Sequence, residues 1–256
     1  MITAAKIKFV NALKLKKHRV ENGLFIAEGT KVISGLIANN YDIAELYATS
    51  AFIETYNNLL SGKKIDITEI TEKELGRISG LTTPNQVLGV CKTREYKIDL
   101  KEILNRWTFV LDGVNDPGNL GTIIRIAHWF NISNIICSHG MVDVYNPKTV
   151  QSTMGSLAFV KTIYTDLPPF LLQLGKKIPV LGTFMTGKNM YDVDLDKRGL
   201  VVFGSESHGI SKEVAQYVSL KVSIPSTLKT SCPDSLNVAV SAGIISAELL
   251  RKGLLK

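Results

Sequence analysis

The chain is poor in cysteine and histidine, and neither type follows a metal-binding pattern. Its three cysteines, Cys91, Cys137 and Cys232, are far apart and odd in number. They predict neither a zinc site nor a disulfide framework, and a reducing cytoplasm fits them best. The four histidines form no His-Glu-x-x-His motif, so we expect no metal ion.

Long apolar runs are also missing. No segment approaches the roughly 20 apolar residues of a membrane-spanning helix, and no apolar stretch typical of a secretory signal follows the basic N-terminus. We therefore expect a cytoplasmic protein without membrane contact. The 256 residues suffice for one large or two modest domains, and the 45% of hydrophobic residues is ordinary for a globular protein.

Acidic side chains are absent from the first 20 positions, although the chain as a whole carries a net charge of only +7. The basic residues of this segment are Lys6, Lys8, Lys14, Lys16, Lys17 and Arg19. Such a run can dock the phosphates of a nucleic acid, or it can be the solvated face of an N-terminal helix. Both interpretations stay open at this point.

Strand and helix signals alternate along the chain, which predicts an α/β fold. In the first half we expect strands near residues 24–29, 43–48, 64–68 and 86–92, and helices near 6–17, 30–40, 51–60 and 71–78. The second half restarts with an apolar run of the kind found in buried parallel strands, at residues 107–113. A charged stretch without strand signal lies between the halves, so we expect two domains and a linker, with bounds 1–97, 98–105 and 106–256.

The end of the apolar run at 107–113 overlaps a polar, glycine-containing loop, Leu111–Gly121. This loop leads into a helix that carries Arg125. A cation near the N-terminal end of a helix opposes the macrodipole unless it has a partner or a task. Asn119 lies six residues before Arg125, and we expect both on nearly the same side of the helix. Taken alone, the segment is better explained by an N-cap asparagine and a solvated arginine.

A second loop, Gly204–Gly209, has the glycine spacing of a phosphate-binding P-loop but lacks its lysine, because Ile210 stands in that place. Glu206 lies inside the loop and would repel a triphosphate. The Gly-x-Ser-x-Gly motif of a hydrolase is absent. We expect the loop to bind a neutral or positively charged ligand, with His208 as a turn or surface residue.

A third segment runs from Val222–Pro225 through a polar loop to Ser235–Val240. Asp234 or Ser235 is a plausible N-cap of the last helix, and Asn237 then lies in its first turn. The small residues of this helix permit close packing against a neighbouring helix or a second subunit.

Together the three segments resemble the signature motifs of the SpoU-type 2′-O-ribose RNA methyltransferases of the SPOUT superfamily. The matching residues are Asn119, Gly121 and Arg125, then Phe203–Glu206 with Gly209, and then Ile224, Pro225 and Ser235–Val238. Residues 143–160 resemble the segment between the family's first two motifs. The N-terminal half resembles the ribosomal-protein-like substrate-binding domain that often precedes this catalytic domain, notably around residues 15–29. The loop 226–234 departs from the pattern, because it is longer and lacks glycine.

The resemblance implies a small α/β RNA-binding domain followed by a SPOUT-type α/β domain with a parallel sheet and a deep trefoil knot. It further implies a homodimer formed through the C-terminal domain. The implied function is S-adenosylmethionine-dependent methylation of a ribose 2′-oxygen in RNA, with ribosomal RNA preferred over transfer RNA. A transfer RNA 2′-O-methyltransferase and a non-catalytic RNA-binding ribosome-assembly protein are the alternatives.

The resemblance also implies roles for individual residues. The catalytic candidates are Arg125, Asn119, Glu206, Ser235 and Asn237. Arg125 would bind the RNA phosphate and stabilise a developing alkoxide, because a guanidinium essentially never loses its proton, and the general base stays open. Asn119 would position the ribose or phosphate, Glu206 would hold Arg125 or loop N–H groups, and Ser235 and Asn237 would complete the pocket wall.

Two further groups of candidates contact the ligands. The cofactor-binding candidates are Gly204, Ile224, Leu236, Thr183 and Gly209. The candidates for contact with RNA phosphates are Lys14, Lys16, Lys17 and Arg19.

Overall fold

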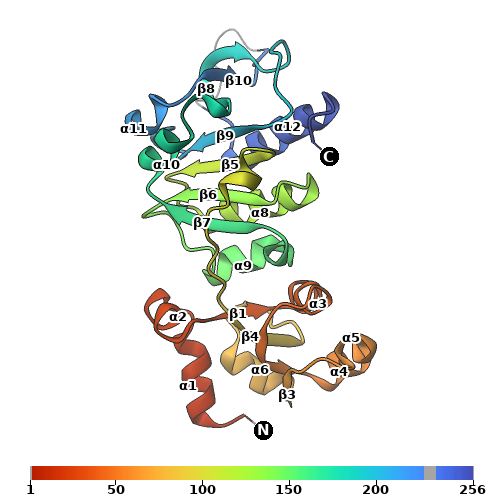
Figure 1. The fold of residues 1–256 in the computed structure, drawn as a ribbon. Helices are drawn as coiled ribbons and strands as arrows, with labels where there is room; N and C mark the ends of the chain where they lie inside the picture. Colours follow the sequence, from red (N-terminus) through yellow and green to blue (C-terminus); the bar gives the residue numbers. More distant parts are fainter. Residues whose placement is uncertain (1, 228–234, 256) are drawn as a thin grey trace. The chain divides into compact units, whose positions relative to one another are not determined.

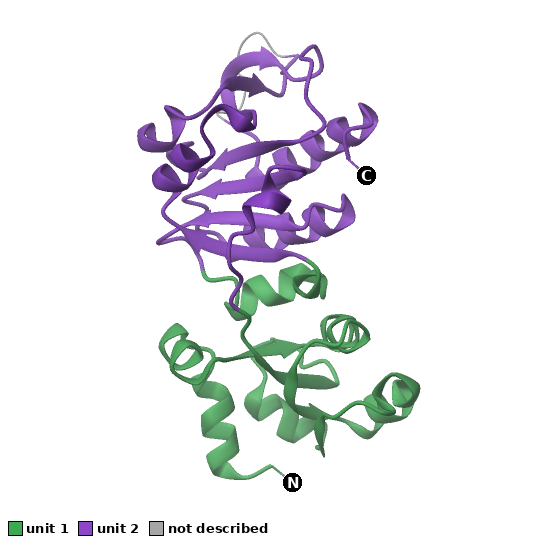
Figure 2. Ribbon diagram, in the orientation of Figure 1, with its two compact units in different colours: residues 1–94, 143–159 green, residues 95–142, 160–256 purple. Residues whose placement is uncertain are grey.

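The computed structural model describes residues 2–227 and 235–255, and its contacts divide the chain into two compact units (Figure 1, Figure 2). Unit 1 contains residues 1–94 and 143–159, and unit 2 contains residues 95–142 and 160–256. The segment 143–159 therefore groups with the N-terminal part of the chain, although the domain limits expected from the sequence assign it to the second domain. Those limits remain a prediction.

Unit 1 is built on a four-stranded mixed sheet with the strand order β1 (Leu24–Glu28), β4 (Val87–Lys92), β2 (Ile43–Ala48) and β3 (Asp66–Glu69). Strand β4 runs antiparallel to both of its neighbours, whereas β2 and β3 are parallel. The helices of this unit are α1 (Ala4–Ala12), α2 (Lys16–Asn22), α3 (Thr30–Ala38), α4 (Ser50–Thr55), α5 (Asn57–Leu60), α6 (Glu72–Ile78), α9 (Pro147–Thr153) and the 3-10 helix η1 (Ser156–Ala158).

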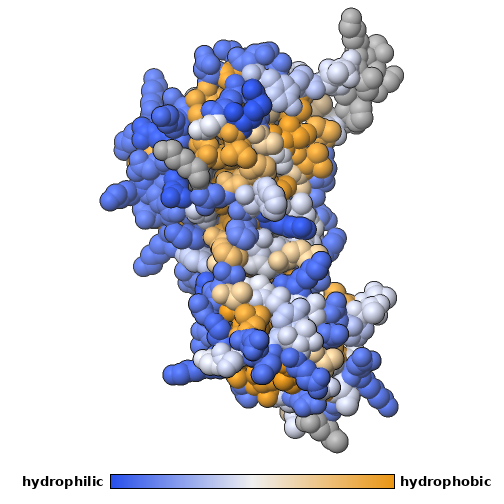
Figure 3. All heavy atoms as spheres, turned by 90° about the vertical axis from the view of Figure 1, so that its right-hand side faces the viewer, coloured by the Kyte–Doolittle hydropathy of each residue, from blue (hydrophilic) through white to orange (hydrophobic). Residues whose placement is uncertain are grey.

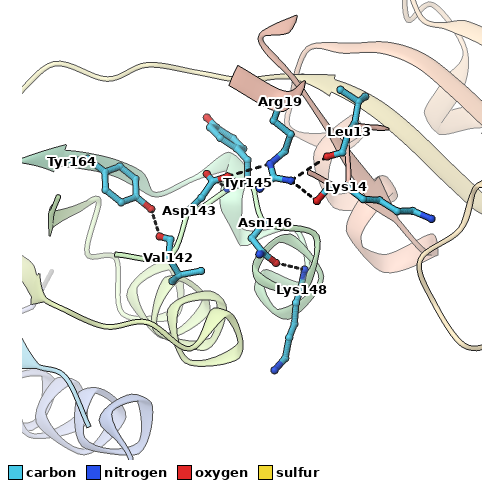
Figure 4. Close-up of polar contacts among 9 residues, drawn as sticks. All are labelled: Leu13, Lys14, Arg19, Val142, Asp143, Tyr145, Asn146, Lys148 and Tyr164. Carbon is cyan, nitrogen blue, oxygen red and sulfur yellow. Dashed lines mark hydrogen bonds and ion pairs between the residues drawn. The ribbon is translucent and has the colours of Figure 1, made fainter. Parts of the chain in front are cut away.

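The prediction of one continuous helix over residues 6–17 is wrong, because the chain forms two separate helices there, α1 and α2. The break near Leu13 leaves carbonyl oxygens without helical partners. Arg19 Nη1 donates hydrogen bonds to the carbonyls of Leu13 and Lys14, at 3.0 and 2.8 Å (Figure 4). One side chain of α2 thereby satisfies the groups that the break leaves exposed.

The guanidinium of Arg19 is also paired with a carboxylate. Its Nε and Nη2 donate to Asp143 Oδ2 at 3.1 and 2.7 Å, and the side chain is only 3% exposed (Figure 4). The other oxygen of Asp143 accepts from the amide of Tyr145 at 2.9 Å. Arg19 therefore ties the residues before α9 to α2, and its burial contradicts the expectation that it contacts RNA.

Helix α9 and η1 pack on α3 through a contact between two glycines. A Cβ added to Gly35 or to Gly155 would lie 3.3 Å from the Cα of the other residue. Gly155 also has a φ of +88°, which favours glycine. The close approach explains why residues 143–159 belong to unit 1.

Unit 2 contains a six-stranded sheet in which all neighbouring strands are parallel, as the sequence predicts. The strand order is β10 (Leu220–Ser223), β8 (Val180–Asn189), β9 (Gly199–Gly204), β5 (Trp107–Asp112), β6 (Asn134–Ser138) and β7 (Lys161–Thr165). Its helices are α7 (Leu100–Ile103), α8 (Pro117–Trp129), α10 (Leu167–Leu174), the 3-10 helix η2 (Gly175–Lys177), α11 (Lys212–Ala215) and α12 (Val238–Arg251).

Both faces of this sheet are covered, and its central strands are buried on both sides. Val110 and Val202 point to the face covered by α7, α10 and α11. Phe109 and Phe203 point to the other face, with ring centroids 5.2 Å apart, and α8 and α12 lie on that side (Figure 1). Motif residues of α8 and α12 are therefore held on one side of one rigid sheet.

The described residues include no cluster of three or more His, Cys, Asp or Glu side chains that could hold a metal ion. No described helix is both long and apolar enough to cross a membrane. Burial raises the pKa of the Cys91 and Cys137 thiols, so both side chains act as small hydrophobic groups.

Replacing Arg19 with leucine should lower the free energy of unfolding by about 3 kcal/mol, because the carboxylate of Asp143, which is only 17% exposed, and the carbonyls of Leu13 and Lys14 lose their partner. Urea unfolding followed by circular dichroism measures the change. The matched control is Lys17→Leu on the same helix, where a side chain that is 79% exposed should change stability by less than about 0.5 kcal/mol. Equal effects of the two substitutions would contradict the assigned role of Arg19.

Candidate active site

The three sequence motifs follow the carboxyl ends of β5, β9 and β10. Because neighbouring strands are parallel, these ends lie at the same edge of the sheet, where open α/β sheets bind ligands. Strand β5 ends at Asp112 and pairs there with Gly204, the last residue of β9. The topology thus brings together segments that are distant in the sequence.

Asn119 connects all three motifs through its side-chain amide. Its Nδ2 donates to Glu206 Oε1, and its Oδ1 accepts from Asn237 Nδ2 at 2.9 Å. Helix α8 begins at Pro117 with Asp116 as its N-cap, so Asn119 lies in the first turn and is not the cap. The amide is therefore free to bridge the Glu206 loop and the start of α12.

Asn237 is itself the N-cap of α12. Its Oδ1 accepts from the amides of Ala239 and Val240 at 2.9 and 3.3 Å, while its Nδ2 reaches Asn119. The expected cap at Ser235 is wrong, because the helix begins three residues later, at Val238. Asp234, the other expected cap, lies outside the described residues.

The loop that carries Glu206 is held by hydrogen bonds between its first and last residues and by a further bond just after it. The backbones of Ser205 and Gly209 exchange two hydrogen bonds, at 3.1 and 2.9 Å. Asp112 Oδ2 accepts from the amide of Ser211 at 2.8 Å. A Cβ at Gly204 would lie 2.0 Å from the carbonyl carbon of Gly209, so only glycine fits there. The loop presents Glu206 on an exposed, well-anchored turn.

A cavity of about 850 Å³ lies beside this loop. All five cofactor-binding candidates, Thr183, Gly204, Gly209, Ile224 and Leu236, contribute to its lining, together with Glu206 and Ser235. Apolar side chains form other parts of the wall, such as Phe184 of β8, Met190 directly after β8, and Ile245 of α12. Asn119, Asn237 and Arg125 lie outside the lining.

A bulge in β8 supplies wall residues that the sequence motifs do not include. Lys221 pairs with Gly182 but Val222 pairs with Lys188, so residues 183–187 leave the ladder between β8 and β10. Phe184 and Met185 of this bulge line the cavity, and Lys221 Nζ lies 5.0 Å from the ring centroid of Phe184. Gly182 directly precedes the bulge and Gly187 is its last residue, and these two glycines are the sequence signal that could have located it.

Arg125 does not join the network of Asn119. Six residues of α-helix turn by about 240° beyond one full turn, so the two side chains point about 120° apart, and the expectation that they share one side is wrong. Arg125 is exposed and forms no ion pair with any residue that the structure describes. Glu206 bonds to Asn119, whereas the resemblance implies Arg125 or loop N–H groups as its partners.

Comparison with known proteins identifies the family. The sequence profile described as the SpoU rRNA Methylase family matches residues 106–247, more than half of the chain. The chain belongs to the SpoU rRNA methylase family. Residues 4–89 match a second profile, described as an MRM3-like substrate binding domain.

Relatives of this SpoU family member match along nearly the whole chain. The 23S rRNA (guanosine(2553)-2′-O)-methyltransferase RlmP of Bacillus subtilis is 26% identical over 94% of both chains. A solved structure from Porphyromonas gingivalis, assigned to the TrmH family of RNA methyltransferases, is 32% identical with a TM-score of 0.88, covering 98% of this chain and 99% of that chain. An AdoMet-bound rRNA methyltransferase from Sinorhizobium meliloti is 29% identical with a TM-score of 0.85, covering 100% of this chain and 97% of that chain.

Replacing Gly204 with alanine should open the Glu206 loop, because the new methyl group overlaps the backbone of Gly209. We expect the Ser205 and Gly209 amides, which bond to each other's carbonyls, to exchange hydrogen at least about tenfold faster. Hydrogen exchange with mass spectrometry measures this. Gly243→Ala in α12 is the control, because its Cβ would lie 3.7 Å from Ile126, an ordinary contact. Unchanged exchange in Gly204→Ala would contradict the steric argument.

Proposed function

We propose that the protein is an S-adenosylmethionine-dependent RNA 2′-O-ribose methyltransferase that acts on ribosomal RNA. The observation that carries the proposal is the Asn119 bridge, which joins the three SpoU motifs beside a cavity of suitable size. Relatives that match along the whole chain include proteins named as 23S rRNA 2′-O-methyltransferases. These names support ribosomal RNA over transfer RNA.

The cavity fits the cofactor chemically. No lysine or arginine occurs among the described residues of its lining, so it offers no counter-charge to a phosphate. It combines apolar walls with the carboxylate of Glu206, which suits a positively charged sulfonium nucleoside. S-adenosylmethionine, when bound, supplies a methyl group on that sulfonium. Gly204, Gly209, Ile224, Leu236 and Thr183 would hold it.

The chain's own residues then orient the ribose and stabilise charge. Arg125 binds the phosphate next to the target nucleotide and stabilises the negative charge on the 2′-oxygen as its proton leaves. Its exposure leaves the guanidinium available for this task. Asn119 positions the ribose, while Glu206, Ser235 and Asn237 hold the loop and the helix start around it.

We further propose that the protein works as a homodimer through unit 2 and that this unit contains the trefoil knot of the SPOUT fold. Figure 3 shows hydrophobic residues gathered on the side of unit 2 where Figure 1 draws α8 and α12. Exposed apolar side chains on these two helices include Trp129, which is 83% exposed, Val240 and Leu250. A second copy of the chain would cover them.

Arg125→Ala should keep the affinity for S-adenosylmethionine within about twofold and lower kcat for methyl transfer about 100-fold or more, because charge stabilisation is removed while the cavity is intact. Isothermal calorimetry and transfer of tritiated methyl groups to ribosomal RNA measure the two effects. Arg106→Ala, an exposed arginine of unit 2 outside the motifs, is the control. A strong loss of cofactor affinity in Arg125→Ala would refute this division of roles, and absence of cofactor binding in the wild type would refute the function.

Of the four candidates for contact with RNA phosphates, Lys16 and Lys17 are exposed, whereas Lys14 Nζ is bonded to Asn11 and to the carbonyl of Ser79. Replacing Lys16 and Lys17 with glutamate should weaken RNA binding and reduce the slope of log affinity against log salt by about 0.7 for each phosphate that the protein no longer neutralises. Filter binding at several salt concentrations measures both values. Lys197→Glu in unit 2 should change neither, and an unchanged slope in the double variant would remove these lysines from the RNA interface.

A further inference from the structure

We propose that a second surface of unit 1 recognises an unpaired base of the RNA. We call it the amide cluster, and it consists of Asn85, Gln86 and Gln151. The inference rests on the proposed function and deepens it, because it states which residues of unit 1 read the substrate. It differs from phosphate binding by the N-terminal lysines, since the three side chains are uncharged.

The loop before β4 is held rigidly at its start by a buried carboxylate. Glu28, at the end of β1, is only 7% exposed. It accepts hydrogen bonds from Ser79 Oγ at 2.6 Å and from the amide of Gly80 at 2.9 Å. Burying a carboxylate is costly unless its partners are well placed, so the position of this loop is strongly determined.

The end of the same loop is fixed by backbone hydrogen bonds to two other strand ends. The carbonyl of Gln86 accepts from the amide of Thr49 at 2.9 Å, and the carbonyl of Val87 accepts from the amide of Gly29 at 2.9 Å. Gln86 is held at a φ of +52°, a left-handed conformation that is unfavourable for a residue with a side chain. Strain of this kind persists where the surrounding structure enforces it, and it is common at binding sites.

Between these anchors the loop contributes little to the core. Thr82, Thr83, Asn85 and Gln86 are all exposed. A buried carboxylate and a strained backbone thus hold polar side chains at the surface, where folding gains little from them. A binding partner explains this arrangement better than stability does.

Helix α9 adds a third amide, Gln151, on the side of the loop where Asn85 lies. A Cβ at Gly29 would lie 3.7 Å from Gln151 Nε2 and 4.0 Å from Asn85 Cβ, so both side chains flank Gly29. The Oε1 atom of Gln151 is buried and has no hydrogen-bond partner among the described residues. A buried acceptor without a partner is unfavourable, so the amide gains free energy if its side chain turns to the surface and a ligand supplies a donor.

The chemistry of the cluster matches a nucleobase. An amide side chain carries a donor and an acceptor next to each other, and this pair is complementary to the edge of a base, best to that of adenine. Proteins read RNA sequence mainly at unpaired bases, whose edges are accessible. Lys31, exposed and two residues after Gly29, is placed to contact the adjoining phosphate.

The test compares Asn85→Ala/Gln86→Gly with wild-type protein, using undermethylated ribosomal RNA from cells that lack the gene. Glycine at position 86 keeps the left-handed backbone and removes only the amide. We expect at least about tenfold weaker RNA binding and a matching rise in KM for RNA, with kcat and the affinity for S-adenosylmethionine within about twofold of wild type. Gln151→Ala, a separate variant on α9, should weaken binding in the same way.

The matched control is Asn57→Ala/Asn58→Ala, which removes two exposed amides from α5 of the same unit. If both amide-cluster variants bind and methylate RNA like this control, the surface does not read RNA, and the proposed function is unaffected. If wild-type protein transfers no methyl group to the RNA, the proposed function fails. The binding comparison still decides the surface in that case, because weaker binding of the cluster variants alone supports it.

Discussion

The architecture of the site depends on one amide group. The side-chain amide of Asn119 donates a hydrogen bond to the carboxylate of Glu206. It also accepts one from Asn237 Nδ2 at 2.9 Å. Only a side chain with a donor and an acceptor can satisfy both partners, so neither an aspartate nor an apolar residue could replace it. Through this group α8, the loop after β9 and the start of α12 are held together, although the chain brings them from positions 87 and 118 residues away.

The negative charge of Glu206 and the positive charge of Arg125 lie at different places around this bridge, and each suits a different kind of ligand. Glu206 lies at the cavity, whose described lining contains no lysine or arginine, whereas Arg125 lies outside it on α8. A carboxylate favours a cationic ligand, and an exposed guanidinium favours a phosphate. Glu206 is bonded to Asn119, and Arg125 forms no ion pair with any described residue, so the two charges do not neutralise each other. A methyl donor with a positive charge and a polyanionic acceptor require this separation.

Local sequence patterns predicted much of the fold, and the resemblance to the SpoU family supplied the candidate site residues, but neither predicted the contacts among them. The apolar run at 107–113 identified a buried parallel strand, because such strands need hydrophobic side chains on both faces. The burial of Arg19 could not be read from its basic neighbours, since it depends on Asp143, 124 residues away. The bond of Asn237 to Asn119 and the pairing of β8 with β10 around the bulge likewise join segments that are distant in the sequence.

The basic N-terminal segment illustrates why a charge pattern in a sequence is not a charge pattern on a surface. Of its four candidate residues, Arg19 is held in a buried ion pair and Lys14 is bonded to Asn11 and Ser79, which leaves Lys16 and Lys17 exposed. Two cations supply affinity for a phosphate backbone but little preference for sequence. Preference among RNAs would therefore come from uncharged groups held in fixed positions, and the loop at Gln86, with its left-handed backbone, holds such groups at an energetic cost.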